Sequence, residues 1–350
     1  MRQPAVRFEN VDIIFGKKPD MAIQALDAGK SRAEILAETG NVLGVANASL
    51  DVGEGEICVL MGLSGSGKST LLRAVNGLNK PTRGAVHVML GEKSVDVASC
   101  DDATLRKLRM QQVAMVFQQF ALLPWRSVAE NVGFGLELSG MSEKQRFQRV
   151  ETQLELVGLS QWANKYAHEL SGGMQQRVGL ARAFATDAPI LLMDEPFSAL
   201  DPLIRTHLQD ELLELQRKLK RTIIFVSHDL DEALKIGTRI AIMEEARVVQ
   251  YGPPQDIVLN PANEYVAQFV AHMNPLNVLN GQAVMARLPA NFAVKPEMAR
   301  LSVAASLREV IEARRQTGLP VLLVENDALV GVAGDDEIYD AITRKAEVKL

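Results

Sequence analysis

One glycine-rich segment has the residue types and spacing of a phosphate-binding loop. It follows the apolar run 57–61, precedes a helical pattern from Thr70 to Val75, and reads Gly62-Leu63-Ser64-Gly65-Ser66-Gly67-Lys68-Ser69. Glycines let backbone N–H groups converge on an anion, because a side chain there would block its approach. Lys68 can supply a mobile cation for the β and γ phosphates, and the Ser69 hydroxyl can ligate Mg²⁺. The segment therefore predicts a triphosphate site where a strand turns into a helix, whose dipole adds positive potential.

Two carboxylates follow a second apolar strand. Asp194 and Glu195 come directly after the run 190–193. An Asp at the carboxyl end of such a strand can reach a Mg²⁺ held by Ser69, and the next carboxylate can polarise an attacking water. We therefore predict that Asp194 is a metal ligand and that Glu195 is the general base of a hydrolytic reaction.

A second helix start also has the character of an anion site. Ser171 is placed as an N-cap, and the glycines at 172 and 173 open the backbone around it, in the segment Leu170-Ser171-Gly172-Gly173. The alternative is an ordinary helix cap. A domain with one phosphate loop needs only one phosphate site, so the second helix terminus suggests service to another subunit's nucleotide.

The elements that position these residues alternate between strand and helix from residue 190 to the helix after His228. This alternation predicts a parallel sheet with helical crossovers and ligands at the carboxyl ends of its strands. Residues 6–10 and 11–15 look like two short strands. Between Phe15 and Val45 the pattern predicts an inserted helical hairpin, with capping-box spacing at Ser31 and Glu34. Strand patterns disappear between 128 and 170, which predicts an all-helical subdomain.

Composition limits the class of protein. The chain has 350 residues, 47% of them hydrophobic and 23% charged, which is typical of a globular protein with a substantial core. A net charge of −5 argues against a dominant nucleic-acid-binding surface. Two cysteines cannot build a disulfide framework. Neither a secretory signal nor a membrane-spanning run is evident, so partners would have to hold the protein at any membrane.

The ordered set of motifs resembles an ATP-binding-cassette ATPase over residues 5 to 272. The set comprises the phosphate loop, Gln118, Leu170 to Gly173, Asp194-Glu195, Ser198-Ala199-Leu200-Asp201 and His228. The resemblance implies an α/β P-loop NTPase fold, with a mixed sheet, helices and an inserted α-helical subdomain at about 121–172. It also implies ATP and Mg²⁺ as cofactors. Met174 stands where the family often has Gln, so a side-chain contact from that position is in question.

The resemblance further implies a head-to-tail dimer in which ATP lies between the Lys68 loop of one copy and the Ser171 helix of the other. Gln118 would sense the γ-phosphate, Mg²⁺ and the attacking water, and His228 would hold the γ-phosphate and that water in line. Asp201 would order the dimer seam, and Phe15 would stack on adenine. From the residues alone, Phe15 could equally be part of the core, and a lone His at a strand end could simply be packed or solvated.

The inserted segment at 17–44 resembles the ATPases of importers for quaternary amines such as glycine betaine, proline betaine and choline. This implies two transmembrane permease subunits, a solute-binding protein outside, and a peripheral place on the cytoplasmic face of the inner membrane. No residue here need touch the amine. The alternatives are an importer ATPase for another small solute and a soluble cassette acting on DNA or ribosomes. The soluble class typically has long heptad arms or paired cassettes, which this sequence lacks.

We place an ATPase domain at 1–275 and a smaller C-terminal module at 276–350. After Asn274-Pro275 the pattern predicts a β-α-β-β-α order, whose last helix runs from Glu337 to Arg344. This order resembles one cystathionine-β-synthase-type regulatory module. Too little chain precedes it for a complete second module. A dimer-stabilising appendage, a sensor and a remnant remain open as its role.

Overall fold

The computed structural model describes residues 4–271, 274, 276, 278–288 and 292–343. The chain divides into two compact units. One comprises residues 1–228 and 241–249, and the other comprises 229–240 and 250–350. The domain boundary that the sequence places after residue 275 stays a prediction.

The central sheet has six strands in the order β10-β9-β3-β8-β7-β6. Their bounds are β3 Ile57–Met61, β6 Val113–Val116, β7 Ile190–Asp194, β8 Thr222–Val226, β9 Arg239–Glu244 and β10 Arg247–Gly252. The pairs β3/β8, β8/β7 and β7/β6 are parallel. Every residue of β3, β7 and β8 is buried, which explains their unbroken apolar runs. The parallel sheet predicted from the alternation is confirmed, and it gathers the carboxyl ends of β3, β8, β7 and β6 along one edge.

The second sheet is antiparallel, in the order β2-β1-β4-β5. Its strands are β1 Val6–Phe15, β2 Val42–Val52, β4 Arg83–Leu90 and β5 Lys93–Asp96. The two short strands predicted before Phe15 are one strand. Asn10 takes a left-handed φ of 48°, and the register shifts between Phe8 and Val11, so the bend is an irregularity within β1.

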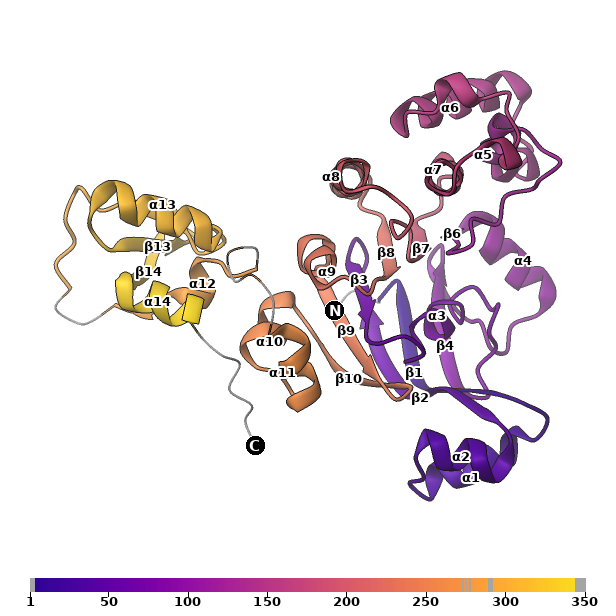
Figure 1. Cartoon of the computed structure of the whole chain (residues 1–350), viewed down its shortest axis with the longest axis horizontal. Coiled ribbons are helices and arrows are strands. Elements are labelled where there is room, and N and C mark those ends of the chain that lie inside the picture. Colours follow the sequence, from indigo (N-terminus) through magenta and orange to yellow (C-terminus); the bar gives the residue numbers. More distant parts are fainter. Residues whose placement is uncertain (1–3, 272–273, 275, 277, 289–291, 344–350) are drawn as a thin grey trace. The chain divides into compact units, whose positions relative to one another are not determined.

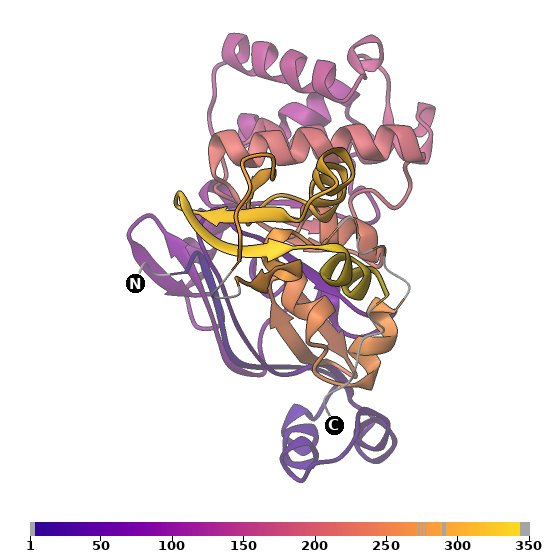
Figure 2. The same cartoon turned by 90° about the vertical axis from the view of Figure 1, so that its left-hand side faces the viewer.

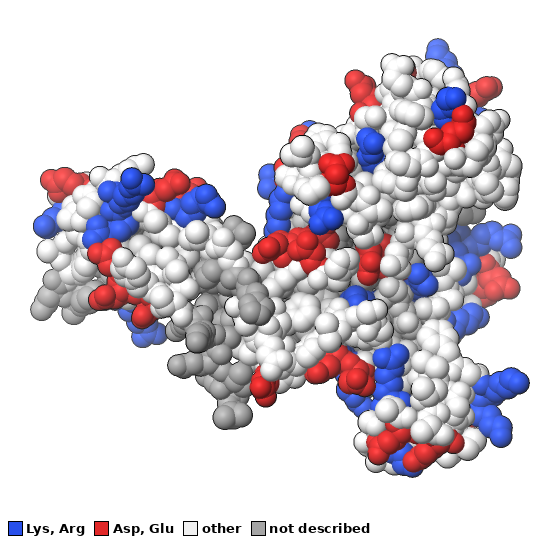
Figure 3. Space-filling view, in the orientation of Figure 1, with Lys and Arg blue, Asp and Glu red and all other residues white. Residues whose placement is uncertain are grey.

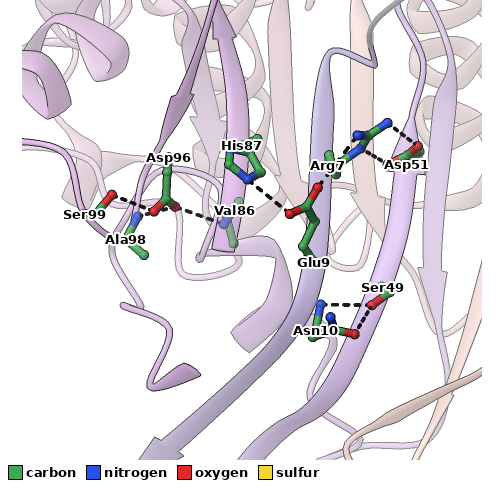
Figure 4. A network of polar contacts seen from close by, with 10 residues as sticks. All are labelled: Arg7, Glu9, Asn10, Ser49, Asp51, Val86, His87, Asp96, Ala98 and Ser99. Atoms are coloured by element: carbon green, nitrogen blue, oxygen red, sulfur yellow. Dashed lines mark hydrogen bonds and ion pairs between the residues drawn. The ribbon is translucent and has the colours of Figure 1, made fainter. Parts of the chain in front are cut away.

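Polar side chains link β4, β1 and β2 across this sheet (Figure 4). Arg7 donates two hydrogen bonds to Asp51. His87 Nε2 lies 3.4 Å from a carboxylate oxygen of Glu9. Polar pairs between neighbouring strands support the register of the strands.

Two short helices leave the sheet between β1 and β2. Helix α1 spans Pro19–Asp27 and α2 spans Arg32–Thr39, and the pair projects beyond the ends of β1 and β2 (Figures 1 and 2). Ser31 and Glu34 form the predicted capping box. Gly40 ends α2 in the left-handed conformation, with φ 67°.

The helix after the phosphate loop, α3, spans Lys68–Leu72 and is shorter than predicted. The N–H groups of Ala74 and Val75 bond to carbonyls three residues back, so the chain tightens into turns where the pattern predicts helix to Val75. Helix α4 spans Asp102–Gln111 and leads into β6.

The predicted helical subdomain is present. Helices α5 Val128–Leu138, α6 Glu143–Leu156 and α7 Gly172–Ala185 pack against one another (Figure 1). Two short 3₁₀ turns, Ser160–Trp162 and Ala167–Glu169, connect α6 to α7. Helix α8, Pro202–Leu219, then leads from β7 to β8.

The second unit contains α9 Leu230–Ile236, α10 Pro254–Leu259, α11 Glu264–Val270, α12 Gly281–Val284, α13 Leu307–Thr317 and α14 Asp335–Thr343. Its sheet has the order β11-β14-β13-β12, with β11 Ala286–Arg287, β12 Arg300–Ser302, β13 Val321–Glu325 and β14 Ala328–Ala333. The predicted β-α-β-β-α order is confirmed as β12-α13-β13-β14-α14. Its last predicted helical residue, Arg344, lies outside the described residues. The likeness to a regulatory module stays a prediction.

Within the described part of the chain, no helix combines the length and the apolar character needed to cross a membrane. On the face drawn in Figure 3, acidic and basic side chains are interspersed. The expectation that the protein has no nucleic-acid partner stays a prediction.

Candidate nucleotide-binding and hydrolysis site

The loop between β3 and α3 has the close backbone contacts that its glycines predict. Gly62 has φ 140°, and a Cβ there would lie 2.1 Å from the carbonyl oxygen of Met243. Gly67 has φ 100°, and a Cβ there would lie 2.3 Å from the carbonyl oxygen of Gly44. Side chains at 62 and 67 would therefore collide with fixed backbone. The tip, at Leu63, Ser64 and Gly65, is exposed.

Lys68 places its ammonium group inside this loop. Its Nζ donates to the carbonyls of Gly62 and Leu63, at 2.9 Å each, and the residue is 6% exposed. Burial lowers the pKa of Lys68, while the carboxylates of Glu195 and Asp194 partly oppose that shift. Ser66 also buries its hydroxyl in the loop without a hydrogen-bond partner. A buried cation beside an unsatisfied hydroxyl fits a polyphosphate, which would compensate both groups.

Two oxygen-bearing side chains meet at the base of the loop. The Ser69 hydroxyl donates to Asp194 Oδ1 at 2.6 Å, and Asp194 is fully buried. Mg²⁺ is commonly held by one or two carboxylates together with phosphate oxygens and water, and this donor set fits that pattern. Across the described residues, no three or more His, Cys, Asp or Glu side chains gather as an all-protein metal site.

Glu195 has a strained but firmly held backbone. Its φ is 49°, in the left-handed region that few residues other than glycine adopt. Its N–H donates to the Val226 carbonyl at 3.1 Å, and its own carbonyl accepts from Gln176 Nε2 at 2.9 Å and from Ser198 Oγ at 3.0 Å. Strain of this kind persists where the surroundings overdetermine it, and it is concentrated at functional sites.

Two further predicted residues converge on the Glu195 carboxylate. Gln118 Nε2 donates to Glu195 Oε2 at 3.0 Å, and His228 Nδ1 lies 3.7 Å from the same oxygen. Gln118 follows β6, Glu195 follows β7, and His228 follows β8. The sheet therefore brings three residues distant in sequence to one point beside the phosphate loop.

The second helix terminus forms a separate cluster. Ser171 caps α7 by accepting the N–H of Met174 at 3.3 Å, and Ser171 and Gly172 are exposed. A Cβ on Gly173 would lie 3.0 Å from the Ala199 carbonyl oxygen. Asp201 caps the next helix by accepting the N–H of Ile204 at 3.1 Å. Helices α7 and α3 lie apart in Figure 1, so one copy does not bring this terminus to its own phosphate loop.

Phe15 lies at the end of β1, beside the loop. The residue is 43% exposed, and a Cβ on Gly44 would lie 2.7 Å from its ring and 3.1 Å from the methyl group of Thr70. Phe15 and Thr70 thus approach the same point next to Gly67. Their predicted nucleotide contacts stay predictions.

Two residues of the site were not predicted from the sequence. Arg73 donates to Asp194 Oδ2 at 2.8 Å. Gln176, 1% exposed, bonds the Glu195 carbonyl through Nε2 and accepts the Ala199 N–H at 2.9 Å through Oε1. Each had a weak signal. Arg73 follows Ser69 by one helical turn, and Gln176 falls within the buried face of a helix, where an amide needs partners.

Comparison with known proteins identifies the family. The family model described as ABC transporter matches residues 45–198. The glycine betaine/proline betaine transport system ATP-binding protein of Escherichia coli is 45% identical over 97% of this chain and 83% of its own length. The glycine betaine transport ATP-binding protein of Bacillus subtilis is 49% identical over 81% of this chain and 66% of its own.

A solved structure agrees with this assignment. It is a dimeric ATP-binding cassette bound to ADP and phosphate in a post-hydrolysis state, 31% identical to this chain. It covers 71% of this chain and 98% of its own, with a TM-score of 0.62. The chain therefore belongs to the ABC transporter family, as an ATP-binding subunit.

Proposed function

We propose that this protein hydrolyses ATP to power import of a quaternary amine such as glycine betaine, proline betaine or choline. The ATPase assignment rests on one observation, a group of contacts at one sheet edge. Ser69 contacts Asp194, and Gln118 and His228 both contact the neighbouring Glu195. The cargo is supported by relatives named for glycine betaine and proline betaine transport, similar over most of this chain.

The phosphate loop binds and orients the nucleotide in this proposal. Backbone N–H groups near Gly67 face the phosphates, and Lys68 exchanges its two carbonyl partners for phosphate oxygens. Thr70 and the exposed loop residues Leu63 and Ser64 complete the cradle. Phe15 stacks its open ring face on adenine.

Ser69 and Asp194 are proposed to hold Mg²⁺, with Gln118 reaching the same ion. The ion supplies charge neutralisation for the transferred phosphoryl group. Arg73 keeps the second oxygen of Asp194 occupied, so the carboxylate stays in one orientation. Glu195 accepts the proton of the attacking water, and Gln118 and His228 keep its carboxylate and that water in line.

The Ser171 helix is proposed to close on the nucleotide of a second copy. Its exposed cap and the N–H groups of Gly172 and Gly173 have no nucleotide in their own copy to bind, whereas a two-fold head-to-tail pair supplies one. Asp201, at the start of α8, lies on this seam. Binding closes the pair and hydrolysis opens it, at the cytoplasmic face of the membrane beneath two permease subunits. A solute-binding protein delivers the amine to them.

A transport assay tests the proposal. The complex is assembled in lipid vesicles from this chain, its two permease subunits and its solute-binding protein, with ATP on the side of this chain. We expect uptake of at least one labelled amine among glycine betaine, proline betaine and choline, and none of maltose. Glu195→Gln serves as the non-hydrolysing control. Uptake that is equal without ATP, or that is confined to maltose, would refute the proposal.

A further inference from the structure

The inserted hairpin α1–α2 contacts the phosphate loop directly. Arg32, the first residue of α2, donates from Nη1 to the carbonyl oxygen of Gly65 at 2.6 Å. The two residues are 33 positions apart in the sequence. Gly65 lies at the exposed tip of the loop, with φ 80°. The hairpin therefore donates a hydrogen bond from a charged side chain to the exposed tip of the phosphate loop.

The hairpin is a fixed support rather than a loose appendage. One face of each helix packs against β1 and β2 in an apolar cluster, formed by Ile14, Ala22, Ala25, Leu26, Ile35, Leu43, Ala46 and Ala246. Ala22 and Ile35 have no exposed surface. Burial of this kind stabilises by roughly 25 cal/mol per Å² of apolar surface, so the position of α2 is set by packing.

Polar contacts close the base of the hairpin. Asn41, 1% exposed, accepts the Lys18 N–H and donates to the Lys18 carbonyl. These bonds join the segment that enters α1 to the segment that leaves α2. Arg83, on β4, donates two hydrogen bonds to Asp27 at the end of α1 and one to the buried Asp12. Bidentate arginine pairs with carboxylates fix geometry as well as contribute energy.

The start of α2 is equally well defined. Ser31 caps the helix by accepting the Glu34 N–H, and Glu34 accepts the Ser31 N–H in return. This reciprocal cap fixes the backbone from which the Arg32 side chain leaves. Arg32 is thus presented from a rigid start, so less side-chain entropy is lost in the bond to Gly65 than a loop arginine would lose.

The bond acts on the peptide between Gly65 and Ser66. In a trans peptide the C=O and N–H point in opposite directions. Arg32 holds the Gly65 carbonyl, and the N–H of the same peptide, that of Ser66, donates across the turn to the Leu63 carbonyl at 3.1 Å. Rotation of this peptide would break both bonds and would turn the Gly65 carbonyl oxygen toward the Leu63 carbonyl, so the turn would have to open.

From these contacts we infer that Arg32 is a positioning residue, through which the inserted hairpin holds the phosphate loop in its anion-binding shape. The inference rests on the proposed role of this loop in nucleotide binding. The guanidinium group of Arg32 contacts the loop at the Gly65 carbonyl, and its proposed role is to hold the loop and not to bind the γ-phosphate. Loss of Arg32 therefore weakens the binding of every nucleotide whose β-phosphate contacts the phosphate loop. The affinity for ADP falls as much as the affinity for ATP.

Nucleotide affinity of the full chain tests the inference, in a Glu195→Gln background that prevents turnover. Arg32→Met keeps the aliphatic stem and removes the donors. We expect the Kd for ATP and for ADP each to rise about five- to tenfold, as for the loss of one solvent-exposed hydrogen bond. Arg32→Lys, which keeps the charge and a group that can donate to the Gly65 carbonyl, should recover most of the affinity.

Lys30→Met is the matched control. Lys30 lies two positions from Arg32 and pairs with Glu38 on the same hairpin. This variant removes the same charge without touching the loop, and its affinities should stay within about twofold of the background. Equal losses for Lys30→Met and Arg32→Met, unchanged affinity in Arg32→Met, or a loss confined to ATP would each overturn the inference. Failure of the background protein to bind either nucleotide would instead refute the proposed function.

Discussion

Single residues in the site are oriented before any ligand arrives. The two oxygens of Asp194 bond to Ser69 and Arg73, and the carboxylate is fully buried. The Glu195 backbone is held in a left-handed conformation by Val226, Gln176 and Ser198. Side chains fixed in this way lose little entropy when a nucleotide binds, which is the physical meaning of preorganisation.

Glu195→Gln separates binding from hydrolysis. The amide keeps the size of the side chain and its contact with Gln118, but it cannot accept a proton from water. We expect the hydrolysis rate to fall at least about 100-fold, with ATP affinity within about threefold of the wild type. Phosphate release and equilibrium binding of ATP measure the two quantities. A rate near that of the wild type would show that Glu195 is not the base.

Gly67→Ala tests the close approach of the loop to Gly44. The new methyl group would meet a backbone oxygen 2.3 Å away, so the loop must move and nucleotide binding should be lost. Gly91→Ala is the matched control, since Gly91 has φ 66° and nothing within 4 Å of the Cβ position. The control should bear only the backbone strain, about 1 kcal/mol of unfolding free energy, and should bind ATP normally. Equal binding by both variants would contradict this account of the loop.

At the level of elements, helix α5 holds the segment 123–127, which follows Gln118, through one buried side chain. Asn131, 1% exposed, donates from Nδ2 to the carbonyls of Leu123, Arg126 and Ser127. Its Oδ1 accepts the Leu123 N–H at 2.8 Å. One amide, with two N–H hydrogens and one oxygen, thereby bonds to four backbone groups, and the segment cannot shift without breaking several of these bonds at once.

Asn131→Asp should destabilise this segment although it preserves shape. The donor becomes an acceptor that faces three carbonyls, at a cost of about 3 kcal/mol in unfolding free energy. That environment raises the pKa of the new carboxyl in the folded state, so the loss should shrink as pH falls. Denaturant unfolding at several pH values measures it. The control is Asn263→Asp at the cap of α11, where either side chain can accept the Val266 N–H. Equal stability of the two variants would contradict the role of Asn131.

At the level of the whole molecule, the proposal gives one copy two half-sites that face different nucleotides. The phosphate loop, Asp194 and Glu195 form one, and the Ser171 terminus of α7 forms the other. A related cassette solved as a dimer with ADP and phosphate supports the proposal that two copies complete each site.

Ser171→Arg should block that pairing. A bulky cation replaces an exposed cap and keeps the closing partner away, whereas ATP binding by the single subunit persists. In a Glu195→Gln background, light scattering should show ATP-dependent dimers that this variant lacks. Ser142→Arg, at another exposed helix cap whose side chain makes no cap bond, should still dimerise. ATP-dependent dimers of the Ser171 variant would exclude the cross-subunit role.

The sequence by itself determined what is local. The alternation of strand and helix from residue 190 to the helix after His228, the caps at Ser31 and Ser171, and the phosphate loop follow from neighbouring residues, because propensity, periodicity and turn chemistry act over a few positions. Predictions from the sequence were less accurate where a local signal competed with packing. The pattern after Thr70 continued as helix, but the chain tightens into turns after Leu72.

Only the tertiary structure decided which distant residues meet. Gln118, Glu195 and His228 share one point because three parallel strands end at one edge. The bonds of Arg73 to Asp194 and of Arg32 to Gly65 depend on how elements pack after they have formed. A motif records residue type and spacing along the chain, whereas a hydrogen bond depends on distance in space, which the packing of helices on sheets sets.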